Sequence, residues 1–205
     1  MIGIVNYGSG NVYAVSNIYK KLNIPHLISR DFHELEKVTH LILPGVGAFD
    51  ETMKILKSSG LKNCLDELVL EKQIPVMGIC VGMQLLANGS EEGIMEGFGW
   101  IKGVVKKFDL SIFDQKPYLP HLGWNTVKVK KESSSVFDGI DHATGFYFLH
   151  SYYFECESEN DILGTTNYGL NYASAVNHNN IFGMQFHPEK SHQNGVTIFN
   201  NFSKI

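Results

Sequence analysis

The stretch from Pro75 to Leu86 constrains the fold more than any other part of this sequence. It begins as a short apolar strand, breaks at Gly78-Ile79-Cys80-Val81-Gly82 and continues as a helix up to Leu86. Small residues two places on either side of Cys80 allow a turn too sharp for bulky side chains, which leaves the middle residue exposed at the top of a sheet. The alternative for such a motif alone is a buried cysteine between two packing glycines.

The chemistry of a cysteine at this position favours a reactive site. A thiol at a helix N-terminus has its thiolate stabilised by the helix dipole and by free N–H groups, so that its pKa falls. The N–H of Val81, the residue after the turn, is placed to stabilise a developing oxyanion. We therefore predict that Cys80 is a nucleophile and that Val81 contributes to an oxyanion hole.

Length and composition limit the classes of protein to consider. The 205 residues fit one α/β domain over residues 1–205, and the 43% of hydrophobic residues provide a sizeable core. A net charge of -4 without a dense run of Lys and Arg argues against nucleic acid or membrane lipid as the main partner. Three widely spaced cysteines predict neither a disulfide framework nor a C-x-x-C pair that binds a metal. No apolar run approaches the length of a membrane-spanning segment. We expect a cytoplasmic protein without metal or cofactor.

The first half of the chain alternates strands and helices. Gly8 and Gly10 resemble the start of a dinucleotide fingerprint, but Tyr13 stands where the third glycine would fall, so we interpret them as a strand-to-helix turn. Apolar spacing predicts strands at 2–6, 26–29 and 40–43 and helices at 12–22 and 51–73, the latter split near Gly60.

The second half has more short strand-like runs, which indicates an antiparallel portion. We expect loops at 90–103 and 111–120, strands at 104–108, 125–129, 146–154, 162–166, 173–177 and 181–186, and a closing helix near the C-terminus. The predicted fold class is α/β, with a mixed and mostly parallel central sheet flanked by helices and an additional antiparallel portion in the second half.

Two loops at strand ends carry further candidate site residues. Pro44-Gly45-Val46-Gly47 follows a strand, and glycine there allows a backbone N–H to turn toward a ligand, so we expect Val46 and Gly47 to supply a second oxyanion donor. After the last strand, His187 and Glu189 would project to the same side of an extended backbone, with Pro188 fixing the φ angle between them. This is the arrangement of an orienting carboxylate and a base beside a nucleophile, with Cys80 as the third member.

Taken together, these motifs resemble those of the class I, or triad-type, glutamine amidotransferases. Within that family they are similar to the glutaminase subunits of imidazole glycerol phosphate synthase. The matching segments span most of the chain in family order: Pro44-Gly45-Val46-Gly47-Ala48-Phe49, Gly78-Ile79-Cys80-Val81-Gly82-Met83-Gln84-Leu85-Leu86, Pro120-His121-Leu122-Gly123-Trp124-Asn125, Phe148-Leu149-His150-Ser151-Tyr152 and Gln185-Phe186-His187-Pro188-Glu189-Lys190-Ser191.

The resemblance implies the fold of that family and a specific reaction. Cys80 would attack the side-chain amide carbon of L-glutamine, His187 would move the proton to the leaving ammonia, and Glu189 would orient His187. A thioester would form, and water would release glutamate. The positions that match the glutamine-binding residues of the family are Gly47, Gln84, Ser151 and Tyr152.

The resemblance also implies a partner, because nothing in 205 residues supplies an ammonia acceptor site. The family pairs this subunit in a heterodimer with a (β/α)₈-barrel cyclase that receives ammonia through an internal passage. Asn11, Trp124 and Lys190 match positions that face that partner. Activity would stay low until the partner binds its ligand, and a peptide flip in Pro44-Gly45-Val46-Gly47 is our hypothesis for the switch.

Three alternatives stay open at this stage. A paralogous glutaminase subunit would supply ammonia to an enzyme of bacterial surface-sugar biosynthesis, with divergence expected at 111–118 and 91–99. A cysteine hydrolase or peptidase on a similar scaffold is the second, although Gln84 and the His-x-Glu segment argue against it. A non-catalytic binding subunit is the third, against which stand the intact Cys80, His187 and Glu189.

Overall fold

A computed structural model describes residues 1–109, 111, 119–130 and 135–205. The predicted linker at 111–120 therefore lies largely outside the described residues. The first half alternates strands and helices: β1 Ile2–Val5, α1 Val12–Lys21, β2 His26–Ser29, α2 Phe32–Leu35, β3 His40–Gly45, α3 Phe49–Ser58, α4 Leu61–Asp66, the π-helix η1 Glu67–Glu71, β4 Val76–Cys80 and α5 Val81–Gln84. The predicted break near Gly60 is confirmed, since that glycine has a φ of 77° between α3 and α4.

The second half is rich in strands, as predicted. It contains β5 Gly89–Ser90, β6 Gly103–Lys107, β7 His121–Asn125, β8 Lys128–Val129, η3 Ser135–Phe137, β9 Phe146–His150, β10 Tyr152–Cys156, η4 Glu159–Asp161, β11 Ile162–Tyr168, β12 Leu170–His178, β13 Ile181–Met184, η5 Pro188–Lys190 and α6 His192–Phe202.

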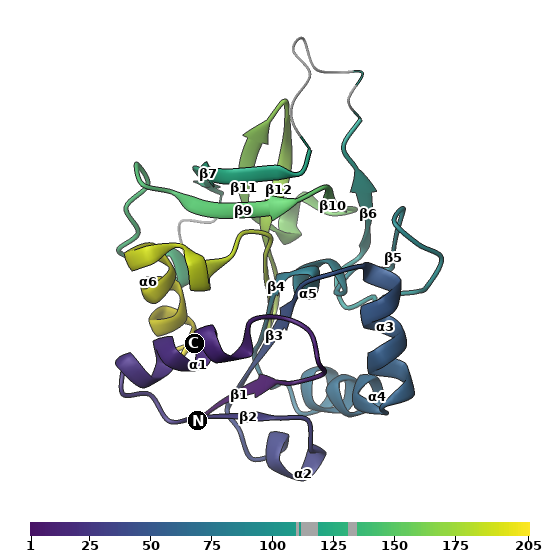
Figure 1. Cartoon of the computed structure of the whole chain (residues 1–205), viewed down its shortest axis with the longest axis vertical. Helices are drawn as coiled ribbons and strands as arrows, with labels where there is room; N and C mark the ends of the chain where they lie inside the picture. The colour runs from purple at the N-terminus through teal and green to yellow at the C-terminus, as the bar shows by residue number, and fades with distance from the viewer. Residues whose placement is uncertain (110, 112–118, 131–134) are drawn as a thin grey trace.

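One large mixed sheet organises the molecule. Its main path runs β2-β1-β3-β4-β13-β12-β10-β6-β5, and β11 and β8 extend it from β12. The strands from β2 to β13 are parallel, whereas β12 and its neighbours pair antiparallel. Helices α1 and α6 cover one face of the parallel part and α3 and α4 the other (Figure 1). Because both faces are covered, β1, β3 and β4 are buried along their whole length.

The order of the three central strands determines where a site can form. β3 and β13 both lie parallel to β4, with Gly45 opposite Cys80 and Met184 opposite Ile79. Their carboxyl ends therefore meet at one edge of the sheet, where open α/β sheets place their ligands. The loop after β3, the turn after β4 and the segment after β13 all emerge at this edge.

Two predicted strands are wrong in extent. The run at 146–154 is two strands, because β9 pairs with β7 in a separate two-stranded sheet while β10 pairs with β6 and β12 in the large sheet. The chain changes sheet at Ser151, and Figure 1 shows the β7–β9 sheet lying across the upper end of the large one. The run at 125–129 is likewise divided, between the end of β7 and β8. Unbroken apolar sequence does not reveal a change of pairing partner.

Candidate active site

Cys80 occupies the sharp turn that the glycine spacing predicts. Its backbone has a φ of 54° and a ψ of -112°, which is rare for a residue other than glycine. A Cβ on Gly82 would lie 1.9 Å from the carbonyl oxygen of Leu43, and one on Gly78 would lie 2.4 Å from that of Gly82. Both glycines are therefore required by close backbone contacts. The helix after the turn is shorter than predicted, since α5 ends at Gln84.

His187 and Glu189 form the predicted pair. His187 Nδ1 lies 2.8 Å from Glu189 Oε1, and the two side chains are 2% and 3% exposed. The prediction of an extended backbone through Pro188 is wrong, because Pro188 starts the 3-10 helix η5. This turn, rather than strand alternation, brings the carboxylate back to the ring.

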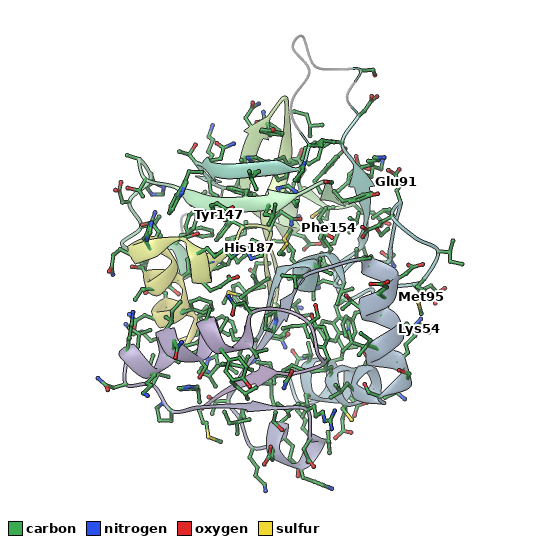
Figure 2. The ribbon with its side chains drawn as sticks, in the orientation of Figure 1. Lys54, Glu91, Met95, Tyr147, Phe154 and His187 are labelled. Atoms are coloured by element: carbon green, nitrogen blue, oxygen red, sulfur yellow. The ribbon has the colours of Figure 1, made fainter. Side chains whose placement is uncertain are left out.

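The segment that carries His187 is fixed from the neighbouring sheet. Its N–H donates to the carbonyl oxygen of Tyr147 over 2.8 Å. The buried hydroxyl of Ser191 donates to the His187 carbonyl over 2.6 Å and accepts from the Tyr147 N–H over 3.0 Å. Figure 2 shows His187 close to Tyr147 just below β9. β9 thus holds the histidine segment in place.

The imidazole of His187 is arranged to carry a positive charge. Burial opposes that charge, but hydrogen bonds with Cys80 and Glu189 outweigh it and raise the pKa of His187 to about 10. His187 and Cys80 line the same cavity. A protonated imidazole at this position is the form that can give a proton to a leaving group.

A cavity of about 260 Å³ brings most of the predicted site residues together. It is lined by the catalytic candidates Cys80 and His187, the oxyanion candidates Val46, Gly47 and Val81, the glutamine-binding candidates Gln84, Ser151 and Tyr152, and also by Glu92, Pro120, Leu149 and His150. A larger hollow of about 610 Å³ beside η3 contains none of the predicted residues. The smaller cavity is therefore the candidate active site.

A chain of amides lies behind the nucleophile. Gln185 is fully buried, and its Nε2 lies 3.8 Å from Cys80 Sγ. Gln84 Nε2 donates to Gln185 Oε1 over 3.1 Å and to the carbonyl oxygen of Tyr152 over 3.2 Å. The carbonyl oxygen of Leu149 lies 3.8 Å from the same sulfur. The sequence interpretation gave Gln185 no role, although it stands two residues before His187 in a matching segment.

The loop after β3 is tied to the loop after β1. The Val46 N–H donates to Ser9 Oγ over 3.0 Å, and that hydroxyl donates to the Val46 carbonyl over 2.5 Å. Tyr7 donates its hydroxyl to the Pro44 carbonyl. The backbone N–H and the carbonyl of Val46 are thus both bonded to Ser9, while Gly47 has a φ of +104° that favours glycine. Sequence gave no signal for the Ser9 contact, which joins residues 37 positions apart.

Glu92 is a charged residue of the cavity that sequence reasoning missed. Its Oε2 accepts from the Phe49 N–H at the start of α3 over 2.9 Å. Its charge and that of Glu91, added to the larger effect of burial, raise the pKa of Tyr152. The acid-rich composition of 91–99 indicated only a loop, and the position of one carboxylate in the cavity follows from the fold.

The predicted partner-facing residues lie on one side of the molecule. Trp124 on β7 is 44% exposed and stacks on His192 with ring centroids 5.1 Å apart. Lys190 Nζ lies 5.6 Å from the Tyr147 ring centroid. Asn11 caps α1, which contacts η5, by accepting from the Ala14 N–H over 3.2 Å.

In the described part of the chain, no group of three or more His, Cys, Asp or Glu residues could hold a metal ion. No helix there is both long and apolar enough to span a membrane.

Comparison with known proteins identifies the class that this fold and site define. A family model described as glutamine amidotransferase class-I matches residues 4–205. A crystal structure of a glutamine amidotransferase superposes with a TM-score of 0.71 at 18% identity, covering 100% of this chain and 99% of the other, and so shares the fold. The chain belongs to the class-I glutamine amidotransferase family, a family of enzymes.

Within that family the curated relatives carry a more particular name. The imidazole glycerol phosphate synthase subunit HisH of Leptospira interrogans is 47% identical over 205 residues, the full length of both chains. The subunit of the same name from Bdellovibrio bacteriovorus is 48% identical, again over 100% of both chains.

Proposed function

We propose that this chain hydrolyses L-glutamine to glutamate and ammonia as the glutaminase subunit of imidazole glycerol phosphate synthase in histidine biosynthesis. The observation that carries the proposal is the shared cavity, in which Cys80 on its strained turn meets a buried His187–Glu189 pair. Relatives of nearly 50% identity over the full length bear the subunit's name. Those names favour the histidine pathway over the surface-sugar alternative.

The proposed reaction assigns one role to each of these groups. The Cys80 thiolate attacks the side-chain amide carbon of glutamine, and the N–H of Val81 stabilises the oxyanion from the start of α5. The proton on His187 passes to the amide nitrogen, which leaves as ammonia. His187 then removes a proton from water, which attacks the thioester and releases glutamate, and Glu189 orients the ring throughout.

The polar wall of the cavity fits the amino-acid end of the substrate. Glutamine carries an α-ammonium group, and the Glu92 carboxylate is the acidic group among the cavity-lining residues. An opposite charge on that wall would stabilise the ammonium in a partly enclosed space. Gln84, Ser151 and Tyr152 complete the glutamine-binding set together with Gly47.

The ammonia acceptor is a (β/α)₈-barrel cyclase subunit, which uses the ammonia to form imidazole glycerol phosphate and AICAR. The two subunits form a heterodimer, and Asn11, Trp124 and Lys190 face the barrel. An internal passage between the two sites keeps the ammonia neutral and away from water. The side of the molecule that displays the exposed Trp124 supports this docking mode.

The test is a glutaminase assay on the purified chain, alone and with the cyclase subunit, with and without the cyclase's ligand. We expect glutamate release to be slow for the chain alone and to rise about a hundredfold or more in the loaded complex, the upper end of usual allosteric couplings. Absence of glutamate release under all of these conditions would refute the proposed activity. Rates that ignore both partner and ligand would refute the proposed regulation.

A further inference from the structure

A buried polar chain behind the glutamine pocket centres on one tyrosine. The hydroxyl of Tyr172, on β12, lies 3.0 Å from Nδ1 of His121 and 3.1 Å from Nε2 of His150. All three residues are at most 5% exposed, and they sit in an aromatic cluster with Phe108 and Phe148. None of the three belongs to the catalytic triad, and the proposed reaction gives them no task.

Both histidines are neutral at physiological pH. Burial is the main cause that lowers the pKa of His150 to about 3 and that of His121 to about 4. Burial also raises the pKa of Tyr172 well above its usual range, so its hydroxyl keeps its proton. A neutral imidazole has one donor and one acceptor nitrogen, so each ring must take one of two tautomers.

The hydrogen-bond partners at the two ends of this buried polar chain decide which tautomer each ring takes. His150 Nδ1 lies 2.7 Å from the carbonyl oxygen of Tyr152, which only accepts, so the proton must be on Nδ1. His150 Nε2 therefore accepts from the Tyr172 hydroxyl, whose oxygen is left to accept from His121 Nδ1–H.

The opposite end agrees with this direction. The amide oxygen of Asn125 accepts from the Thr126 N–H over 2.8 Å, so its Nδ2 donates to the Asn167 carbonyl and faces His121 Nε2 at 3.3 Å. His121 Nε2 must therefore be an acceptor. Every donor in the buried polar chain then meets an acceptor, and all of its hydrogen bonds can point in one direction only.

The buried polar chain ends at the glutamine pocket. The Tyr152 carbonyl that accepts from His150 also accepts from Gln84 Nε2, and Gln84 donates to Gln185 beside Cys80. His150 is the last residue of β9 and Tyr152 the first of β10, so the contact spans the change of sheet at Ser151. The same hydrogen bonds thus fix the wall of the cavity that contains two predicted glutamine-binding residues.

We propose that Tyr172 is a positioning residue for glutamine binding, whose hydroxyl bridges His121 and His150 and so fixes the Tyr152 carbonyl and the Gln84 amide. The inference rests on the proposed glutaminase function. β7 presents Leu122 and Trp124 outward and His121 inward, so the bridge also connects the proposed partner face to the pocket.

The first test is kinetic and compares Tyr172→Phe with Tyr153→Phe in the complex with the cyclase subunit. Tyr153 lies in the same cluster, with its ring centroid 6.0 Å from that of Tyr172, but outside the polar chain. We expect Tyr172→Phe to raise the KM for glutamine about tenfold with kcat within about twofold, the effect of one lost hydrogen bond, and Tyr153→Phe to leave both unchanged. An unchanged KM, or a fall in kcat alone, would overturn the inference.

The second test needs neither activity nor a folded variant. Imidazole ¹⁵N NMR of the wild-type chain should show two neutral rings, His121 and His150, that carry the proton on Nδ1 and do not titrate between pH 8 and 5.5. A proton on Nε2 of either ring, or titration near pH 6.5, would overturn the inference. A wild-type complex without glutaminase activity would refute the proposed function and leave this NMR prediction standing.

Discussion

Glu189 uses only one of its carboxylate oxygens in the described structure. Oε1 contacts His187, whereas Oε2 is buried without a hydrogen-bond partner. A buried carboxylate is costly unless an opposite charge accompanies it, and the neighbouring His187 supplies that charge when protonated. The carboxylate therefore favours the protonated form of His187.

The first prediction concerns this pair. Because Glu189 helps to raise the pKa of His187, Glu189→Gln should lower that pKa and move the alkaline limb of kcat/KM to lower pH. The rate at the optimum should fall about 10²- to 10⁴-fold, the range for a disturbed general acid–base group. Glutamate release measured from pH 6 to 10 checks both effects.

The matched control is Glu71→Gln, which changes an exposed carboxylate on η1. It should keep the wild-type profile. A Glu189→Gln enzyme with an unshifted alkaline limb would contradict the assigned role of the carboxylate.

At the scale of elements, the site depends on three loops held at neighbouring strand ends. The turn after β4 packs Gly82 against the β3 backbone and Gly78 against the backbone of Gly82, and η5 after β13 is held by β9. The loop after β3 differs, because Val46 is 48% exposed and its backbone N–H and carbonyl are held by one side chain, Ser9. It is the part of the oxyanion site with the fewest restraints.

The second prediction tests the hypothesis that this loop switches the glutaminase activity on when the partner binds its ligand. Removing the hydroxyl in Ser9→Ala frees the N–H and the carbonyl of Val46, so that N–H can turn toward Cys80. We expect the activity of the chain without its partner to rise about tenfold, the factor for one hydrogen bond, and the stimulation by the loaded cyclase to shrink accordingly.

Ser58→Ala serves as the control, since Ser58 also donates to a backbone carbonyl but lies at the exposed end of α3. Glutamate release by the isolated chains measures the effect. An unchanged or lower basal rate in Ser9→Ala would show that the Ser9 contact does not restrain the oxyanion loop.

At the scale of the whole molecule, the buried histidines make stability depend on pH. The folded-state pKa values of His121 and His150 are about 4 and about 3, below the ordinary value of 6.5. Between pH 6.5 and pH 4 the unfolded chain binds more protons than the folded chain. The free energy of unfolding therefore falls as the pH falls through this range.

The third prediction is a loss of about 1.4 kcal/mol per pH unit for each of the two histidines in that range. Urea unfolding at pH 7, 6, 5 and 4.5 checks it. His33→Gln, at a side chain that is 82% exposed, should keep the slope, whereas His150→Leu should reduce it. A free energy of unfolding that is flat from pH 6.5 to 5 would contradict the assignment of neutral, buried rings.

The sequence was sufficient for features that depend on local spacing. The glycines around Cys80 predicted the turn because each would clash through a single added carbon, and apolar periodicity predicted the alternating first half. The pairing of His187 with Glu189 was confirmed, although a 3-10 turn rather than a strand produces it.

Features that depend on pairing between distant segments could not be predicted. The division of 146–154 between two sheets follows from the partners of β9 and β10, which one apolar run does not specify. The contact of Ser9 with Val46 and the bridge by Tyr172 likewise join segments that only the folded chain brings together.

The central claim is that Cys80 becomes acylated while glutamine is hydrolysed. The most direct measurement is mass spectrometry of the complex, acid-quenched during turnover with glutamine, for wild type and Cys80→Ala. We predict a glutamyl adduct on the peptide that contains Cys80 in the wild type, and neither adduct nor glutamate release in Cys80→Ala. Undiminished glutamate release by the alanine variant would contradict the account.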